Sequence, residues 1–109
     1  MNLNLDKIHS MFRSSALEVC KYAESNKNVN KVVAIGSATN VNQYPEEDDT
    51  LDVVIFLNNP SNDVAEKIAD AIFYNISNVT PYVEGESDIN MNALNLYVDK
   101  GVTIYESEN

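Results

Sequence analysis

Two adjacent residues in this chain have the chemistry of an anion-binding turn. Gly36 and Ser37 directly follow the apolar run 32–35, which has the β-branched character of a buried strand. Glycine permits a tight backbone turn, and serine can present a hydroxyl group and a backbone amide to an anion. A turn of this kind at the end of a strand could therefore contact a phosphate group.

Five carboxylates follow shortly after this turn. They are Glu46, Glu47, Asp48, Asp49 and Asp52. The first four belong to a polar loop, whereas Asp52 directly precedes the apolar run 53–57 and is expected at the mouth of a second strand. Two aspartates at positions i and i+2 of a strand point to the same face, where they can share a Mg²⁺ ion. The residue two positions before Asp52 is Thr50, so Asp49 could join Asp52 at a metal only if a β-bulge re-aimed it.

The spacing of apolar side chains predicts the elements that must position these residues. Intervals of three and four residues predict amphipathic helices over 4–25 and 63–76. Continuous or alternating apolar runs predict strands over 32–35, 53–57, 79–84 and 102–105. Pro81 restricts the third of these strands to a sheet edge or a strand end. Residues 89–98 fit either a strand or a short helix. This order predicts an α/β (α+β) fold, a two-layer sandwich with helices packed on a small mixed sheet.

Composition narrows the function classes. The 109 residues are enough for one domain, residues 1–109, and carry 17 acidic against 7 basic side chains, a net charge of −10. This balance argues against direct binding of nucleic acid, which depends on Lys and Arg contacts to phosphates, and against an anionic membrane surface. It suits either solubility alone or a basic protein partner that is reached by electrostatic steering.

The cysteine count and the N-terminus indicate a cytoplasmic setting, in a bacterium or a phage-infected host. Cys20 is the only cysteine, no run approaches the ~18 apolar residues of a membrane span, and the first residues lack the pattern of a secretory signal. Cys20 is expected to be a small buried hydrophobic residue. His9 has no His or Cys nearby, so it is expected to be a surface or half-buried histidine rather than a metal ligand.

The ordered set of motifs resembles the minimal members of the nucleotidyltransferase superfamily. In that family, an N-terminal helix precedes a strand that ends in Gly-Ser, and a loop leads to a strand with two aspartates. A helix and a strand with a third carboxylate follow. Gly36-Ser37 match the turn and Asp52 matches the second aspartate. The phrase KGVTIYE at 100–106 is similar to the closing phrase of the family.

The resemblance implies a nucleotidyltransferase-like fold in which carboxylates hold Mg²⁺ ions that bridge the phosphates of a nucleoside triphosphate. Asp49 and Asp52 would be the metal ligands, with Glu84 as the nearest candidate for the third carboxylate. This chain departs from the family pattern because Thr50 stands at the first aspartate and residues 38–40 supply no basic side chain after the turn. The sequence therefore favours a degenerate active site.

Two function hypotheses follow. In the first, the protein needs no cofactor and uses an acidic rim to bind, and inhibit or regulate, a basic protein that processes nucleic acid, as antitoxins and anti-CRISPR inhibitors of nucleases do. The rim comprises Glu46, Glu47, Asp48, Asp49, Glu84, Glu86 and Asp88. In the second, the protein is an active Mg²⁺-dependent nucleotidyltransferase that moves a nucleotide from a triphosphate to a protein or small molecule. A further hypothesis is a homo-oligomer built on an exposed sheet edge near residues 102–105.

Overall fold

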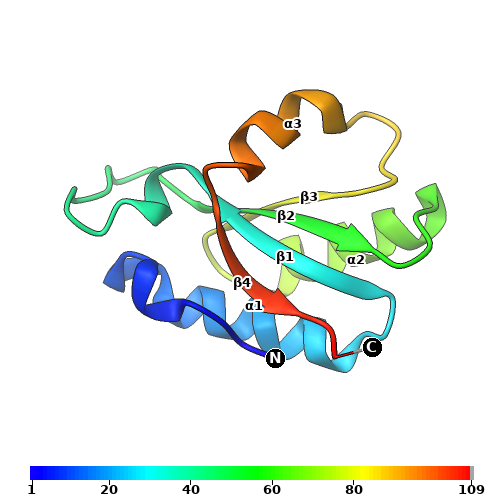
Figure 1. The fold of residues 1–109 in the computed structure, drawn as a ribbon, viewed down its shortest axis with the longest axis horizontal. Coiled ribbons are helices and arrows are strands. Elements are labelled where there is room, and N and C mark those ends of the chain that lie inside the picture. Colours follow the sequence, from blue (N-terminus) through cyan, green and yellow to red (C-terminus); the bar gives the residue numbers. More distant parts are fainter. Residues whose placement is uncertain (109) are drawn as a thin grey trace.

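A four-stranded mixed sheet forms the centre of the molecule (Figure 1). The computed structural model describes residues 1–108. The strands are β1 (Val29–Ile35), β2 (Leu51–Leu57), β3 (Val79–Val83) and β4 (Val102–Glu106), and their order across the sheet is β3-β2-β1-β4. β1 runs antiparallel to β2 and β4, whereas β2 and β3 are parallel. The predicted α+β class with a small mixed sheet is confirmed.

Helices cover the two faces of this sheet to different extents. α1 (Arg13–Ser25) and α2 (Asn62–Asn75) pack on one face, and the short α3 (Met91–Val98) lies over part of the other (Figure 1). Neighbouring residues of β2 alternate between the faces: Val53 belongs to the main core under α1 and α2, and Val54 to the smaller cluster under α3. The two longer helices and the sheet form the predicted two-layer sandwich, to which α3 adds a partial cover.

The central strands are longer than the apolar runs that predicted them. β1 begins before the run 32–35 because Lys31 remains in the strand, with its ammonium group 4.9 Å from the centre of the Phe56 ring on β2. On β2, Asp52 is paired with Ile35 of β1. Asp52 therefore lies within the strand, one residue from its start, instead of in front of it.

The single helix predicted over 4–25 is wrong in its first half. Leu5–Lys7 and Ser10–Phe12 form two short 3-10 helices, and the α-helix begins only at Arg13. Extended backbone at Ile8 and His9 separates the turns, and the Arg13 side chain donates a hydrogen bond of 2.9 Å to the Ile8 carbonyl. Ile8 is nevertheless fully buried. The apolar spacing therefore identified the buried side chains correctly, although the backbone that carries them takes a different path.

Residues 89–98, which fitted a strand or a helix, contain the helix α3. Its first turn is closed by the side chain of Asn90, which accepts a hydrogen bond of 3.2 Å from the Ala93 amide. This cap satisfies an amide that has no partner within the helix. None of the helices in residues 1–108 is long and apolar enough to cross a membrane.

The outer edge of β4 is covered by the beginning of the chain. The Leu3 amide donates to the Ile104 carbonyl at 2.8 Å, and the Glu106 amide donates to the Met1 carbonyl at 3.2 Å. The structure thus contradicts the expectation of an exposed edge near Val102–Tyr105, because the N-terminal segment takes the hydrogen bonds that a second copy would need.

The outer edge of β3 is protected by its side chains. Pro81 lies on this edge strand, as predicted, and has no N–H group to offer to another strand. The Val83 amide donates to the carboxylate of Glu86 at 2.8 Å, so it is also taken. Both edges of the sheet therefore oppose pairing with another chain.

Candidate functional site

The end of β1 and the start of β2 bring together the turn and the carboxylate that the sequence singled out. Gly36 begins a 3-10 helix, Gly36–Thr39, with a φ of +77° that favours glycine. A Cβ atom at Gly36 would lie 3.5 Å from Oδ2 of Asp52. The structure therefore places Gly36 and Asp52 side by side, because the pairing of Ile35 with Asp52 fixes the register of the two strands.

Asp52 is held by a short chain of hydroxyl groups. Thr50 Oγ1 donates a hydrogen bond of 2.7 Å to Oδ1 of Asp52 and lies 2.8 Å from the hydroxyl of Thr80 on β3. Thr50 lies two residues before Asp52, the position at which the sequence pattern of minimal nucleotidyltransferases has its first aspartate. It supplies a hydrogen-bond donor to Asp52 where a metal pair would need a second carboxylate.

Asp49 forms hydrogen bonds within its own loop. Its Oδ2 accepts a hydrogen bond of 2.9 Å from the Glu46 amide, and its own amide donates to the Glu46 carbonyl at 3.1 Å. These reciprocal bonds close residues 46–49 into a compact turn, here called the acidic turn. Glu46, Glu47 and Asp48 are exposed on it, whereas Asp49 is half-buried.

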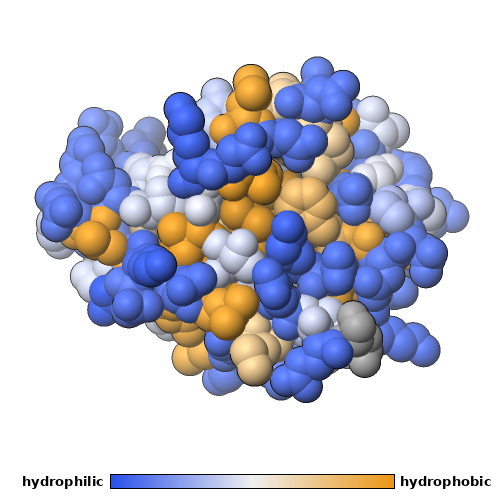
Figure 2. All heavy atoms as spheres, viewed as in Figure 1, coloured by the Kyte–Doolittle hydropathy of each residue, from blue (hydrophilic) through white to orange (hydrophobic). Residues whose placement is uncertain are grey.

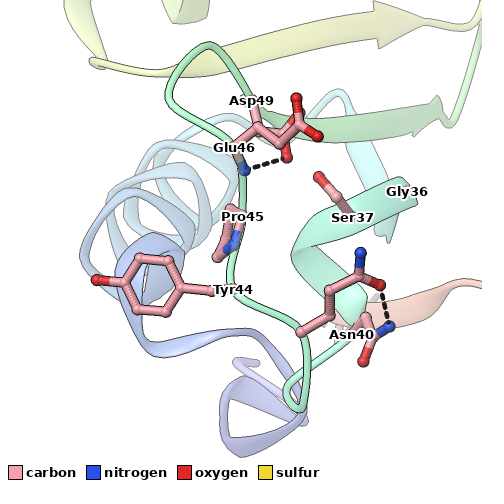
Figure 3. Close-up of a pocket in the computed structure, with 8 residues that line it drawn as sticks. Gly36, Ser37, Asn40, Tyr44, Pro45, Glu46 and Asp49 are labelled. Atoms are coloured by element: carbon pink, nitrogen blue, oxygen red, sulfur yellow. Dashed lines mark hydrogen bonds between the residues drawn. The ribbon is translucent and has the colours of Figure 1, made fainter.

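Two hollows meet at Gly36, and each contains one of the two aspartates. The loop hollow, about 470 Å³ in volume, contains Asp49 (Figure 3). Its lining residues are Gly36, Ser37, Asn40, Gln43, Tyr44, Pro45, Glu46 and Asp49. The helix hollow, about 280 Å³, contains Asp52, and it is lined by Ile35, Gly36, Asp52, Tyr82, Leu94 and Tyr97. The predicted pair Asp49 and Asp52 is therefore divided between two hollows.

The carboxylate set expected for a metal is not assembled in the described part of the chain. No group of three or more His, Cys, Asp or Glu side chains in residues 1–108 is arranged to hold a metal ion. Glu84 lies beyond the end of β3, where its Oε1 accepts a hydrogen bond of 3.0 Å from the Leu57 amide at the end of β2. Asp52 is paired with Thr80 near the start of both strands, so Glu84 lies roughly 13 Å further along the sheet. The expectation that Glu84 completes a set with Asp52 is wrong.

The predicted acidic rim is divided into two patches. The acidic turn precedes β2, whereas Glu84, Glu86 and Asp88 follow β3, which runs parallel to β2. The two groups therefore lie at opposite ends of the sheet (Figure 1). Burial raises the pKa of Glu86, which supports the Val83 amide, and Asp88 is exposed. A single partner surface that touches all seven carboxylates at once would have to span the whole sheet.

His9 is buried and contacts Tyr44 of the loop hollow, so the expectation of a surface or half-buried histidine is wrong. Its side chain is 7% exposed, and its Nδ1 accepts a hydrogen bond of 3.1 Å from the Met11 amide. The His9 amide donates to the Ala38 carbonyl at 2.8 Å. The ring meets that of Tyr44 edge to face, with centres 5.6 Å apart. Figure 3 shows the Tyr44 ring turned away from Ser37, so the contact ties the loop to the N-terminal turns.

Sequence reasoning missed the helix hollow. Two tyrosines face Asp52 there, one from β3 and one from α3, and burial together with the Asp52 charge raises the pKa of Tyr82. The apolar and aromatic residues of 89–98 could have indicated this hollow. Its position could not be predicted from them, because a strand and a helix would direct Leu94 and Tyr97 to different places.

Comparison of the chain with protein-family models, with curated proteins and with solved structures finds no match.

Proposed function

We propose that this protein is a non-catalytic binding module whose acidic turn engages a basic surface of a protein partner. The observation that carries the proposal is the geometry of the turn. Three consecutive carboxylates, Glu46, Glu47 and Asp48, are exposed on a turn that Asp49 closes through its own side chain. These hydrogen bonds fix the backbone that carries the three exposed carboxylates, which reduces the backbone conformational entropy lost on binding.

The charge balance supports this proposal. The chain carries ten more acidic than basic side chains, and no carboxylate of residues 1–108 forms an ion pair with a basic side chain. The negative potential is therefore not neutralised locally. Such a potential accelerates encounters with a positively charged partner and repels polyanions.

The most suitable partner is a basic protein that processes nucleic acid. Such proteins concentrate Lys and Arg where they bind phosphates, and an acidic protein can cover that surface. The protein would then inhibit or regulate its partner, as an antitoxin-like or anti-CRISPR-like inhibitor does. In this view, the resemblance to minimal nucleotidyltransferases reflects a fold retained after the loss of its chemistry.

A comparison of two charge-matched variants tests the proposal. The first neutralises the acidic turn (Glu46→Gln, Glu47→Gln, Asp48→Asn) and the second neutralises three exposed carboxylates on α1 and α2. The second variant carries the substitutions Glu18→Gln, Glu24→Gln and Asp70→Asn. Exposed ion pairs contribute roughly 0.2–1 kcal/mol each, so loss of three should weaken binding by roughly 3- to 150-fold, with the larger effect at low salt.

Each variant and the unmodified chain would be used to capture proteins from host lysate, and the captured protein would then be purified for direct binding and nuclease assays. We expect a basic nucleic-acid-processing protein that binds the unmodified chain and the helix variant, loses affinity for the turn variant, and is inhibited on binding. Equal affinity for both variants, or a partner without a basic surface, would overturn the proposal.

The alternative is an active Mg²⁺-dependent nucleotidyltransferase, and the adjacency of Gly36 and Asp52 favours it. The division of Asp49 and Asp52 between two hollows does not fit the usual ligand set. A thermal-shift titration with Mg²⁺ and each nucleoside triphosphate tests it, because a ligand of the native state raises the melting temperature. A shift that needs both ligands and is lost in Asp52→Ala would favour this alternative over the binding module and would justify a search for the acceptor.

A further inference from the structure

The helix hollow has a composition that differs from that of the acidic surface around it. It lies where α3 crosses the end of the sheet, with Ile35 and Leu94 as apolar walls and the rings of Tyr82 and Tyr97 beside them. Figure 2 shows apolar surface between α3 and the strands beneath it, framed by hydrophilic side chains. Asp52 supplies the only charge among the residues that line it.

The size of the hollow limits what it can hold. Its volume of about 280 Å³ falls just below the range of roughly 300–1,000 Å³ that is usual for sites of drug-sized ligands. A hollow of this size accommodates one amino-acid side chain. A triphosphate would also bring its negative charges against the Asp52 carboxylate, which no basic lining residue offsets.

One oxygen of the Asp52 carboxylate already accepts a hydrogen bond, and the other is open to a ligand. Oδ1 accepts the hydrogen bond from Thr50, and Oδ2 lies on the side of Gly36, where the absent side chain leaves space. No basic side chain in residues 1–108 pairs with Asp52. A half-buried carboxylate of this kind is suited to a cation that also donates hydrogen bonds.

We infer that the helix hollow binds the side chain of an arginine from the protein partner. This inference rests on the proposed function, and it identifies a second contact beside the acidic turn. A planar guanidinium group can donate to a carboxylate and stack on tyrosine rings, and its apolar stem can lie against Ile35 and Leu94. Lysine offers a compact ammonium group that is more strongly hydrated and stacks less well. The hollow adjoins the loop hollow at Gly36, so a basic surface that meets the acidic turn can insert one side chain here.

Blocked amino acids test the site without any partner. N-acetyl-arginine N-methylamide would be titrated into the ¹⁵N-labelled protein, with the equivalent lysine and citrulline compounds as probes of charge and shape. We expect saturable amide shifts at Gly36, Leu94 and Tyr97 with the arginine compound at millimolar concentration, weaker shifts with lysine, and none with the uncharged citrulline.

Two variants separate the site from the general acidity of the chain. Asp52→Asn retains an oxygen that can accept from Thr50 but removes the charge, and it should weaken arginine binding by at least about tenfold. Tyr97→Ala changes an exposed side chain and should weaken binding without unfolding the domain. The helix variant Glu18→Gln, Glu24→Gln, Asp70→Asn removes three exposed charges that do not line the hollow, and it should leave the shifts unchanged.

The outcomes distinguish the two proposals. Arginine-specific shifts that Asp52→Asn abolishes would support the site even if no basic partner were found, in which case only the proposed function would fail. Partner binding that Asp52→Asn leaves unchanged would overturn the inference and retain the acidic turn. Equal shifts with arginine and lysine, or shifts spread over the acidic turn, would also overturn it, because they indicate non-specific attraction to the negative surface.

Discussion

Gly101 allows the connection between α3 and β4 to lie directly on the central strand, and its replacement by alanine tests this arrangement. A Cβ atom at this position would come within 2.6 Å of the Ala34 carbonyl oxygen and 2.7 Å of Cγ1 of Val33. Gly101 does not adopt a positive φ, so alanine would be penalised by contact alone. Because the nearer obstacle is backbone of β1, it cannot rotate away as a side chain can.

The magnitude of the penalty follows from these distances. Ordinary van der Waals contact begins at 3.4 Å, so the connection would have to move by about 0.8 Å from Ala34. Val102, the next residue, is paired with Ala34, so the shift would disturb the ladder between β1 and β4. Overpacking of this kind costs roughly 1–3 kcal/mol, and the stiffer unfolded chain offsets about 0.4–1 kcal/mol of that. A net loss of about 1–2 kcal/mol should lower the melting temperature by roughly 4–8 °C.

Thermal denaturation followed by circular dichroism measures this shift, with Lys100→Ala as the matched control on the neighbouring exposed residue. The control should differ from the unmodified chain by less than about 0.5 kcal/mol. Amide shifts of Leu94 and Tyr97 should also move in Gly101→Ala, since α3 ends just before this connection. A melting temperature within about 1 °C of the control would refute the close approach of Gly101 to β1.

Two further predictions concern titratable groups. Burial raises the pKa of Glu86 above its ordinary value of 4.5, so the folded state holds this proton more tightly and the wild type loses stability as pH rises above about 4.5. Glu86→Gln keeps an oxygen for the Val83 amide and should therefore raise the melting temperature at pH 7 but not at pH 4; a decrease at pH 7 would contradict this reasoning. Burial raises the pKa of Cys20 from 9.0 to about 11, which leaves roughly a hundredfold less thiolate at pH 8. Labelling with a thiol reagent should be at least a hundredfold slower in the native protein than in urea, and rates within tenfold of each other would show that Cys20 is accessible.

The central strands could be predicted from the sequence because each of them is a short run of consecutive apolar residues. The runs 32–35 and 53–57 are apolar over both faces, a pattern that is typical of central strands covered on both sides. The N-terminal residues have the spacing of a helix, yet they fold as two 3-10 turns. Hydrogen bonds of Arg13 to the Ile8 and Asp6 carbonyls support that path, and apolar spacing does not encode such contacts.

The candidate site was predictable only in part, for a similar reason. The turn at Gly36 and its neighbour Asp52 follow from the order of strand, turn and strand. The place of Asp49 depends on its hydrogen bonds to the Glu46 backbone, and that of Glu84 on the parallel pairing of β2 and β3. Neither interaction is visible as a periodicity, so Asp49 and Glu84 were both expected beside Asp52 although the fold separates them from it.

The separation of the acidic residues also indicates which end of the sheet is available to a partner. At the end of β3, Glu84 supports the Leu57 amide and Glu86 supports the Val83 amide, so a partner could recruit these carboxylates only by competing with backbone hydrogen bonds. At the start of β2, the exposed carboxylates of the acidic turn do not support a backbone amide, and the Asp49 side chain fixes the backbone of the turn that carries them. The helix hollow opens at this same end, beside Gly36. If the proposed function is correct, a basic surface binds where β1 ends and β2 begins, and neutralising Glu84 and Glu86 should affect stability more than binding.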